Sequence, residues 1–262
     1  MGIMTGKTCV VTGGAGSIGL ASASLLHQEG ARVMLVDRDV KSLGEAAASL
    51  TAGATAGQAG AAERVATVAA NVADAEDTKR YLGETVRRWG KIDVIFSNAG
   101  VAGAIAPVTE YPEEVFDEVM AVNVRGSFLA CKYGLPLMND GGSIVITSSI
   151  MGVTGGPLAV AYATSKHALV GLARVVATEA AARRIRVNVL APGPTDNTFQ
   201  RAIEKEFAKI AGQDSPDLMD KMIPLGRHAE AEEIAQMVLF LASDRSSFST
   251  GAVFMADGGM AI

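Results

Sequence analysis

A tyrosine and a lysine four positions apart, Tyr162 and Lys166, are the residues whose types and spacing point most directly to chemistry. On a helix, side chains at this spacing share one face. A phenol has a pKa of about 10 and is a poor base at neutral pH, but a neighbouring ammonium lowers that pKa toward the working range. Ser149, upstream of the pair, could hold the oxygen of an alcohol or a carbonyl. The three residues predict proton transfer at such an oxygen, although Tyr-x-x-x-Lys alone also occurs by chance on surface helices.

A glycine-rich loop near the N-terminus predicts a phosphate site. Residues 12–19, TGGAGSIG, follow an apolar run, precede a helical pattern and contain the Gly-x-Gly-x-x-Gly spacing of dinucleotide-binding loops. Small residues let the backbone approach a pyrophosphate, whose charge meets the free N–H groups and the positive end of the helix. The alternative is an ordinary tight turn between a strand and a helix. The residues expected at the pyrophosphate are Gly13, Gly16, Ser17, Ile18 and Gly19.

The end of the second predicted strand carries a residue that discriminates between dinucleotides. A carboxylate at Asp37 can accept hydrogen bonds from both hydroxyls of an adenine ribose, and it would repel a 2′-phosphate. The adjacent Arg38 favours the opposite choice, because a guanidinium can accommodate that phosphate. Since the glycine loop contains no basic residue, we expect NAD, with NADP as the less favoured cofactor.

The elements that must position these residues alternate along the chain. Apolar runs stopped by Gly, Asn or Asp indicate strands, and longer periodic segments indicate helices. The strands are uninterrupted apolar runs, which is typical of a parallel sheet covered on both faces, and the alternation predicts right-handed βαβ units in a doubly wound (Rossmann) α/β fold of three layers. The predicted strands are 8–11, 33–36, 65–69, 92–96, 143–147, 185–190 and 252–255, and the helices are 17–29, 40–50, 77–89, 113–138, 161–182 and 232–241.

Residues 1–262 show no linker-like break, so we expect a single domain. Two segments are irregular. The long excursion at 194–223 leaves the carboxyl end of a strand, where a substrate lid would lie. The tract at 52–62 is rich in Ala and Gly, and we assign it no function.

Composition excludes several classes of protein. With 23 basic and 28 acidic side chains, the net charge of −5 lacks the basic footprint of a nucleic-acid binder. No apolar stretch reaches the length of about 18 residues that spans a membrane, and the first residues do not resemble a signal peptide. Two cysteines cannot form a disulfide framework, so we expect a cytoplasmic protein. The three histidines are scattered, which predicts no metal site.

The chain resembles the short-chain dehydrogenase/reductase family over about residues 7–259. That resemblance implies a seven-stranded parallel sheet. It also implies that Tyr162 is the acid/base and that Ser149 positions the substrate oxygen. Lys166 would then bind the nicotinamide ribose and lower the tyrosine pKa, while Asn123 would hold a water in a proton relay. The motifs that carry the resemblance are the glycine loop, Asp37, Asn98-Ala99-Gly100, Asn123, Ser149, Tyr162 with Lys166, and Pro192-Gly193.

The resemblance also implies further cofactor contacts. Asn71 and Val72 stand where the family usually has Asp-Val beside the adenine, and Thr195 suits the nicotinamide carboxamide. Ser17 replaces a glycine of the usual family loop, which changes the local phosphate geometry. A homo-oligomer is implied as well, most often a tetramer built through two long helices, here 113–138 and 161–182.

These expectations converge on an NAD(H)-dependent oxidoreductase that interconverts a secondary alcohol and a ketone. The mostly apolar residues expected at the substrate side favour an uncharged or partly hydrophobic small molecule. A 3-oxoacyl thioester reductase using NADPH is the alternative within the family, although Asp37 argues against NADPH. A dinucleotide-sensing protein without turnover is the alternative outside enzymes.

Overall fold

The computed structural model describes residues 2–52, 62–212 and 218–262. Most of the Ala/Gly-rich tract and residues 213–217 of the predicted lid therefore lie outside the described residues. Seven parallel strands form one sheet in the order β3-β2-β1-β4-β5-β6-β7, which confirms the predicted doubly wound α/β fold. The strands are β1 Thr8–Thr12, β2 Arg32–Asp37, β3 Val65–Ala69, β4 Ile92–Ser97, β5 Met138–Thr147, β6 Arg186–Pro192 and β7 Val253–Ala256.

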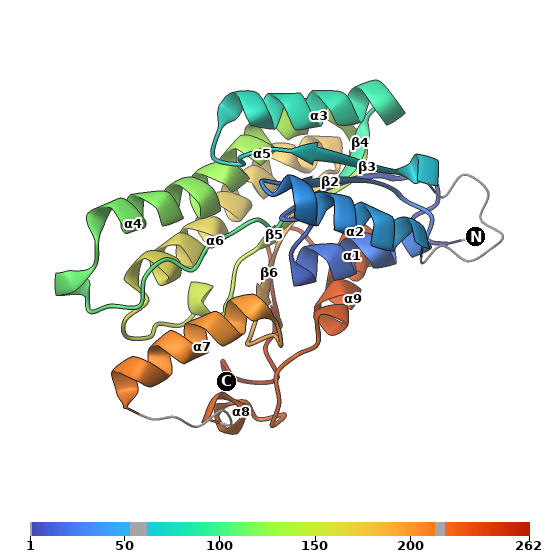
Figure 1. Ribbon diagram of the computed structural model, residues 1–262. Coiled ribbons are helices and arrows are strands. Elements are labelled where there is room, and N and C mark those ends of the chain that lie inside the picture. The colour runs from blue at the N-terminus through green and yellow to red at the C-terminus, as the bar shows by residue number, and fades with distance from the viewer. Residues whose placement is uncertain (1, 53–61, 213–217) are drawn as a thin grey trace.

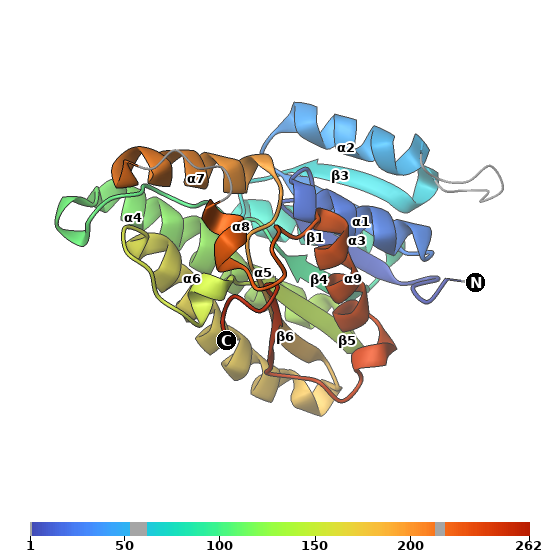
Figure 2. The same cartoon turned by 90° about the horizontal axis from the view of Figure 1, so that it is seen from below.

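Helices cover both faces of the sheet (Figures 1 and 2). On one face α1, α2 and α9 pack over a core that includes Cys9 and Val11 of β1, and on the other α3, α5 and α6 pack over a core that includes Val10. Successive residues of one strand are thus buried on opposite faces, which explains the uninterrupted apolar runs. No helix in the described parts of the chain is both long and apolar enough to cross a membrane. The helices are α1 Ser17–Gln28, α2 Val40–Ala52, α3 Ala75–Trp89, α4 Glu113–Val119, α5 Gly126–Gly134, α6 Val160–Ala180, α7 Thr198–Ala211, α8 Leu218–Met222 and α9 Ala231–Ala242.

The helix predicted over 113–138 is wrong in two respects. It is interrupted after α4 by a π-helical turn, Met120–Arg125, and it ends in the short 3₁₀ helix Leu135–Leu137. Pro136 lacks the N–H donor that a continuing α-helix needs. Met138 opens β5 instead, where it pairs with Ile92 of β4. The other predicted helices and strands differ from the structure mainly by a few residues at their ends.

The order of the strands places a crevice at the carboxyl ends of β1 and β4. From β1 the chain builds outward through β2 to β3, and then returns to place β4 on the other side of β1. The connections that leave these two neighbours run in opposite directions, which opens a space for a ligand between them. The predicted lid begins beyond the carboxyl end of β6 and contains α7 and α8.

The loop after β1 brings α1 unusually close to the strand. Gly13 has a φ of +64°, a conformation that favours glycine. A Cβ built on Gly19 would collide with the carbonyl oxygen of Gly13, whereas a Cβ on Gly16 would meet the same oxygen at 3.4 Å, an ordinary contact. The absence of a side chain at Gly19 therefore lets the first turn of α1 lie against the end of β1.

Replacing Gly19 with alanine tests this close approach. We expect Gly19→Ala to lower the free energy of unfolding by about 2 kcal/mol, because the methyl group meets backbone that cannot move away independently. Urea unfolding followed by circular dichroism measures the change. Gly16→Ala is the matched control and should cost less than about 1 kcal/mol. Equal losses for the two variants would contradict the packing argument.

Candidate active site

A cavity of about 1150 Å³ opens at the carboxyl ends of the central strands. It extends from the glycine loop, past the ends of β4 and β5, to the helices α7 and α8. Two predicted site residues do not line it, Gly19 and Asn123. The predicted site residues that do line it are Gly13, Gly16, Ser17, Ile18, Asp37, Arg38, Asn71, Val72, Asn98, Ala99, Gly100, Ser149, Tyr162, Lys166, Pro192, Gly193 and Thr195.

The N-terminus of α1 fits a phosphate group. Gly16 is its N-cap residue, no side chain caps this end, and its first turn contains no acidic residue. The first N–H groups of a helix lack intrahelical acceptors, and the helix dipole places partial positive charge there. Because Gly13, Gly16 and Ser17 line the cavity at this point, a pyrophosphate could approach the exposed N–H groups. Gly19 contributes indirectly, through the packing described above.

The carboxylate of Asp37 is fixed at the end of β2. One oxygen, Oδ1, accepts a hydrogen bond from the backbone N–H of Arg38 at 2.8 Å, and Oδ2 accepts one from Ala15 at 3.2 Å. Carboxylate oxygens have capacity for further donors, and Asp37 lines the cavity. The site is therefore suited to a pair of ribose hydroxyls. The Arg38 side chain next to it is exposed.

Asn98 ties three strand ends together. Its Nδ2 donates to the carbonyl oxygen of Thr12 at 3.3 Å, and its Oδ1 accepts from the Thr147 hydroxyl at 3.1 Å. The Thr12 hydroxyl in turn accepts from the backbone N–H of Asn98 at 3.0 Å. Thr12 and Thr147 were not among the predicted site residues, and nothing in their local sequence indicates that they meet. These bonds hold the ends of β1, β4 and β5 in register beneath the cavity.

Tyr162 and Lys166 both project from the first turns of α6 into the cavity. The Lys166 ammonium is buried, donates to the carbonyl oxygen of Thr147 at 2.9 Å, and lies 5.4 Å from the centre of the tyrosine ring. Burial lowers the pKa of Lys166 to about 8. Burial also raises the pKa of Tyr162, and a hydrogen bond with Ser149 lowers it in part.

That Lys166 lowers the pKa of Tyr162 stays a prediction, because the ammonium is close to the ring while burial dominates the pKa of the phenol. The ammonium lies over the ring and directs one donor to Thr147, and loss of solvent is the larger influence on the phenol. Ser149 follows the end of β5 by two residues and caps a short 3₁₀ helix, Ile150–Gly152, with its Oγ accepting from the N–H of Met151 at 3.2 Å. A group that approaches the Tyr162 hydroxyl therefore meets the serine hydroxyl as well.

Asn123 lies behind the cavity, in the π-helical turn. Its Oδ1 accepts from the N–H of Val101 at 2.9 Å, and its Nδ2 donates to the Val101 carbonyl oxygen at 3.0 Å and to the Ser165 hydroxyl at 2.9 Å. Ser165 donates to the Tyr162 carbonyl oxygen at 2.7 Å. A Cβ on Gly100 would meet Asn123 Oδ1 at 3.2 Å and Lys166 Nζ at 3.5 Å. Asn123 therefore joins the loop after β4 to α6, close to the lysine.

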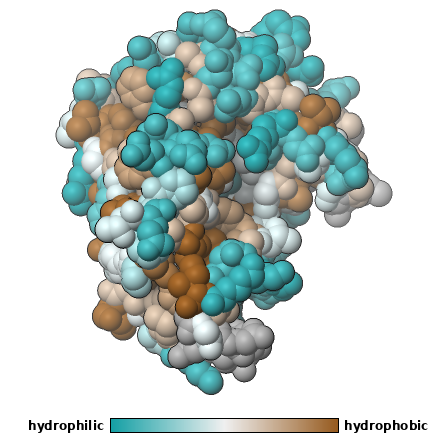
Figure 3. Space-filling view, turned by 60° about the vertical axis from the view of Figure 1, so that its left-hand side comes forward, coloured by the Kyte–Doolittle hydropathy of each residue, from teal (hydrophilic) through white to brown (hydrophobic). Residues whose placement is uncertain are grey.

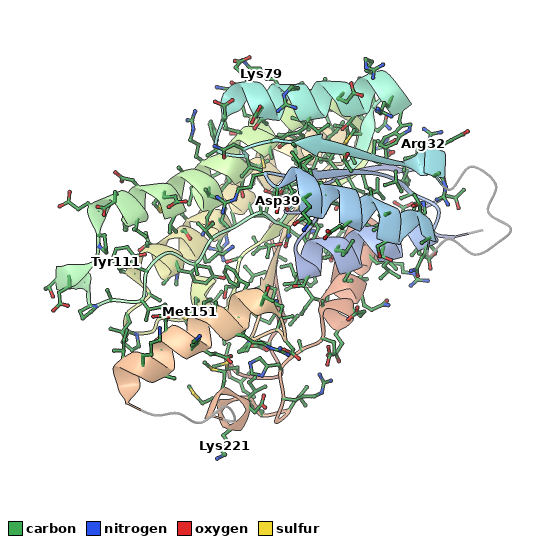
Figure 4. All side chains as sticks on the ribbon, in the orientation of Figure 1. Arg32, Asp39, Lys79, Tyr111, Met151 and Lys221 are labelled. Carbon is green, nitrogen blue, oxygen red and sulfur yellow. The ribbon has the colours of Figure 1, made fainter. Side chains whose placement is uncertain are left out.

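The far end of the cavity is mostly apolar and is lined in part by the predicted lid, through α7 and α8. Met151, labelled in Figure 4, lines this end together with residues of α7. The Tyr111 hydroxyl positions the loop after β4 by accepting from the N–H of Ala104 at 3.0 Å. In Figure 3, hydrophobic side chains on this side of the molecule are flanked by hydrophilic ones. The apolar lining comprises Ile105, Met151, Phe199, Ile203, Phe207, Met219, Met222 and Met260.

His228 has two carboxylate partners that the sequence does not indicate. The nearest acidic residue along the chain is Glu230, yet the ring nitrogens of His228 lie 2.7 Å from carboxylate oxygens of Glu204 and Asp220. Both partners are distant in sequence, so no local pattern indicates the contact. The described residues contain no group of three or more His, Cys, Asp and Glu side chains arranged to hold a metal ion.

The chain matches known proteins over nearly its whole length. The family model described as enoyl-(acyl carrier protein) reductase matches residues 5–261. A 3-oxoacyl-[acyl-carrier-protein] reductase of Thermotoga maritima is 37% identical over 261 residues, covering 99% of this chain and 99% of that protein. Among solved structures, levodione reductase has a TM-score of 0.92 at 33% identity and covers 98% of both chains. NAD⁺-bound xylitol dehydrogenase has a TM-score of 0.90 at 34% identity, covering 98% of this chain and 99% of that one.

The buried ammonium of Lys166 predicts a specific pH dependence of stability. Between about pH 8 and pH 10.5, the unfolded chain keeps a proton on this lysine that the folded chain has released. Stability of the wild type should therefore rise with pH in this window relative to Lys166→Met, by at most about 3 kcal/mol. Urea unfolding at pH 7, 8.5 and 10 measures the difference. The exposed Lys132→Met should follow the wild type, and parallel curves for wild type and Lys166→Met would contradict the prediction.

Proposed function

The chain belongs to the short-chain dehydrogenase/reductase family, and from this membership we propose an NAD(H)-dependent oxidoreductase that interconverts a secondary alcohol and a ketone. The observation that carries the proposal is that Tyr162, Ser149 and Lys166 line one cavity that begins at the glycine loop, where the Ser149 side chain lowers the pKa of Tyr162 in part. Two hydroxyls that share one site suit a single substrate oxygen. Proton transfer at that oxygen is the half of alcohol oxidation that the protein must supply itself.

Each polar residue has a distinct task in this proposal. Tyr162 exchanges the hydroxyl proton of the substrate, and Ser149 hydrogen-bonds the same oxygen and orients it. Lys166 stabilises the tyrosinate and holds the nicotinamide ribose. Asn123 fixes α6 and the loop after β4 from behind the cavity, and it would hold a water in a proton relay. The bound nicotinamide supplies or accepts the hydride, and the protein contributes position and electrostatics.

The residues present fit a nicotinamide dinucleotide along the polar side of the cavity. Uncapped N–H groups of α1 would bind the pyrophosphate. Asp37 and Arg38 would contact the adenine ribose, and Asn71 and Val72 would contact the adenine. The nicotinamide half would lie among Asn98, Ala99, Gly100, Tyr162, Lys166, Pro192, Gly193 and Thr195. The fixed carboxylate of Asp37 supports NAD over NADP, because a 2′-phosphate would bring like charges together.

The substrate side supports an uncharged, partly hydrophobic small molecule. Four methionines and two phenylalanines line it, and their apolar side chains would pack against rings or alkyl chains. The segment 194–223, through its described helices α7 and α8, would act as the lid. Two of its charged side chains reach the lining, Glu204 and Lys205. They have opposite signs, and the lining as a whole offers no cluster of like charge for an ionic substrate.

A 3-oxoacyl thioester reductase remains the second candidate. It is favoured by the 37% identity with the 3-oxoacyl-[acyl-carrier-protein] reductase of Thermotoga maritima, and it would use the same hydroxyl pair on a ketone. The Asp37 carboxylate argues against an NADPH-dependent version. A sensor that binds a dinucleotide without turnover fits less well, since Tyr162, Ser149 and Lys166 all face one cavity.

We also propose a homo-oligomeric, cytoplasmic protein, with a tetramer as the expected assembly. Apolar side chains exposed on α5 and α6 support association through these helices, including Phe128 at 43% and Val175 at 56% exposure. Both cysteines are free and buried, in keeping with a reducing compartment.

Tyr162→Phe tests the proposed acid/base. We expect kcat to fall by about a thousandfold, since the ring remains but the exchangeable proton is lost. Turnover is followed by NADH absorbance with secondary alcohols from 2-butanol to 2-decanol and with cyclohexanol, and NADH affinity by fluorescence should stay near the wild-type value. Tyr133→Phe, on α5 and outside the cavity lining, is the matched control. An active Tyr162→Phe enzyme would remove the assigned base.

Asp37→Ser tests cofactor choice. The wild type should prefer NAD over NADP by about a hundredfold in kcat/KM, because the 2′-phosphate would lie against a fixed carboxylate. Asp37→Ser should reduce that ratio at least tenfold. Asp39→Asn is the control, since Asp39 (Figure 4) instead accepts hydrogen bonds at the start of α2 and does not line the cavity. If Asp37→Ser left the NAD/NADP ratio of kcat/KM unchanged, Asp37 would not be the residue that selects the cofactor.

A further inference from the structure

One histidine joins both helices of the substrate side. His228 Nε2 lies 2.7 Å from Oε1 of Glu204 on α7, and His228 Nδ1 lies 2.7 Å from Oδ1 of Asp220 on α8. The imidazole side chain is only 16% exposed. A single ring therefore spans the two helices, with one carboxylate at each nitrogen.

The two contacts together require a protonated ring. Carboxylates only accept hydrogen bonds, and a neutral imidazole carries one N–H donor, so it can satisfy one partner but not both. The imidazolium carries two donors and satisfies both. Burial lowers the pKa of His228, but the hydrogen bonds and charges of Glu204 and Asp220 outweigh it, so the pKa is raised overall.

His228 is itself attached to the body of the protein. Its neighbour Ala229 forms a parallel bridge with Thr195, donates to the carbonyl oxygen of Pro194 at 3.0 Å and accepts from the N–H of Asp196 at 2.9 Å. Arg227 donates to the His228 carbonyl oxygen at 2.8 Å and pairs with Glu233 of α9. The ring is thus a fixed point at the end of β6, to which α7 and α8 are bonded.

The helices that the ring bonds carry the apolar lining of the cavity. Phe199 and Ile203 line it from α7, and Met219 and Met222 from α8, next to Asp220. Lys221, by contrast, points away from the body in Figure 4. The Glu204 oxygen that meets His228 also accepts from the amide of Gln200 at 2.8 Å, and Gln200 lines the cavity. A chain of hydrogen bonds therefore runs from the substrate side to His228.

We propose that His228 is a positioning residue that, as the imidazolium, fastens α7 and α8 over the substrate side of the cavity and so lowers the KM for substrate. This inference rests on the proposed function, because it assigns the apolar end of the cavity to substrate. Among the residues that the structure describes, the charged groups that face the ring are Glu204 and Asp220. The nearby Arg227 is paired with Glu233, and Arg201 with Asp196 at 2.6 Å.

The direction of the pH effect follows from the raised pKa. Both hydrogen bonds are present at low pH, and one is lost as the pH rises through the pKa of the folded-state histidine. KM should therefore be lowest at low pH and should increase above that pKa. An uncharged substrate contributes no titration of its own to this change.

Asp220→Asn separates the protonation requirement from the architecture. An introduced amide can donate to Nδ1, while the neutral ring still donates from Nε2 to Glu204, so both contacts survive without the imidazolium. In this variant α7 and α8 should stay fastened over the cavity at all pH values. His228→Leu removes both contacts, so α7 and α8 should be unfastened at every pH.

Hydrogen exchange of the free protein tests the fastening without any substrate. Protection factors are measured for peptides covering α7 and α8 at pH 6 and pH 9, corrected for intrinsic exchange. The protection factors of the wild type should fall at least about fivefold from pH 6 to pH 9, and those of Asp220→Asn should fall less than twofold. The protection factors of His228→Leu should be low at both pH values. Lys166 also titrates in this window, but it is common to all three proteins. Equal pH dependence in wild type and Asp220→Asn would overturn the proposal.

Kinetics test the consequence for substrate. With the best secondary alcohol of the series from 2-butanol to 2-decanol and cyclohexanol, the wild-type KM should rise about fivefold from pH 6 to pH 9 relative to Asp220→Asn. A difference in kcat with equal KM would overturn the positioning role. If no alcohol in the series is turned over, the proposed function fails, while the exchange experiment still decides whether His228 fastens the helices.

Discussion

The hydrogen bond from the buried Lys166 ammonium to the Thr147 carbonyl oxygen, at 2.9 Å, fixes the helix that carries the chemistry against the sheet that carries the cavity. Burying an ammonium is costly unless its donors are used, so α6 is held where this acceptor lies. The Ser148 hydroxyl reinforces the same junction by donating to the Lys166 carbonyl oxygen at 2.8 Å. Tyr162, one turn earlier on α6, is thereby placed beside Ser149 at the end of β5.

The cavity has a polar end and an apolar end, and both lie at the same edge of the sheet. Small residues after β1 and β4 let polar backbone groups line one end, while longer apolar side chains from α7 and α8 line the other. Parallel strands deliver both sets of loops to the same edge. The hydroxyl pair of Tyr162 and Ser149 lies between the ends, where a dinucleotide on one side would meet an apolar substrate on the other.

Much of this arrangement could be predicted because its signals are local. Each signal lies within a short stretch of sequence: the glycine loop, Asp37 at a strand end, and the Tyr162–Lys166 spacing. The parallel topology follows from the uninterrupted apolar strands. The π-helical turn at Asn123 could not be predicted. Its Asn123 side chain is hydrogen-bonded to the backbone of Val101, which is distant in sequence. The contacts of His228 could not be predicted for the same reason, since Glu204 and Asp220 approach it only in the folded chain. The direction of the Tyr162 pKa also depends on burial, which spacing does not reveal.

The central claim is that this cavity oxidises a carbinol carbon by direct hydride transfer to a nicotinamide. A secondary alcohol deuterated at that carbon, incubated with the protein and NAD in ordinary water, tests it most directly. Direct transfer predicts that mass spectrometry finds one deuterium in the reduced cofactor for each ketone formed. Reduced cofactor without deuterium, or ketone formed without reduced cofactor, would contradict it.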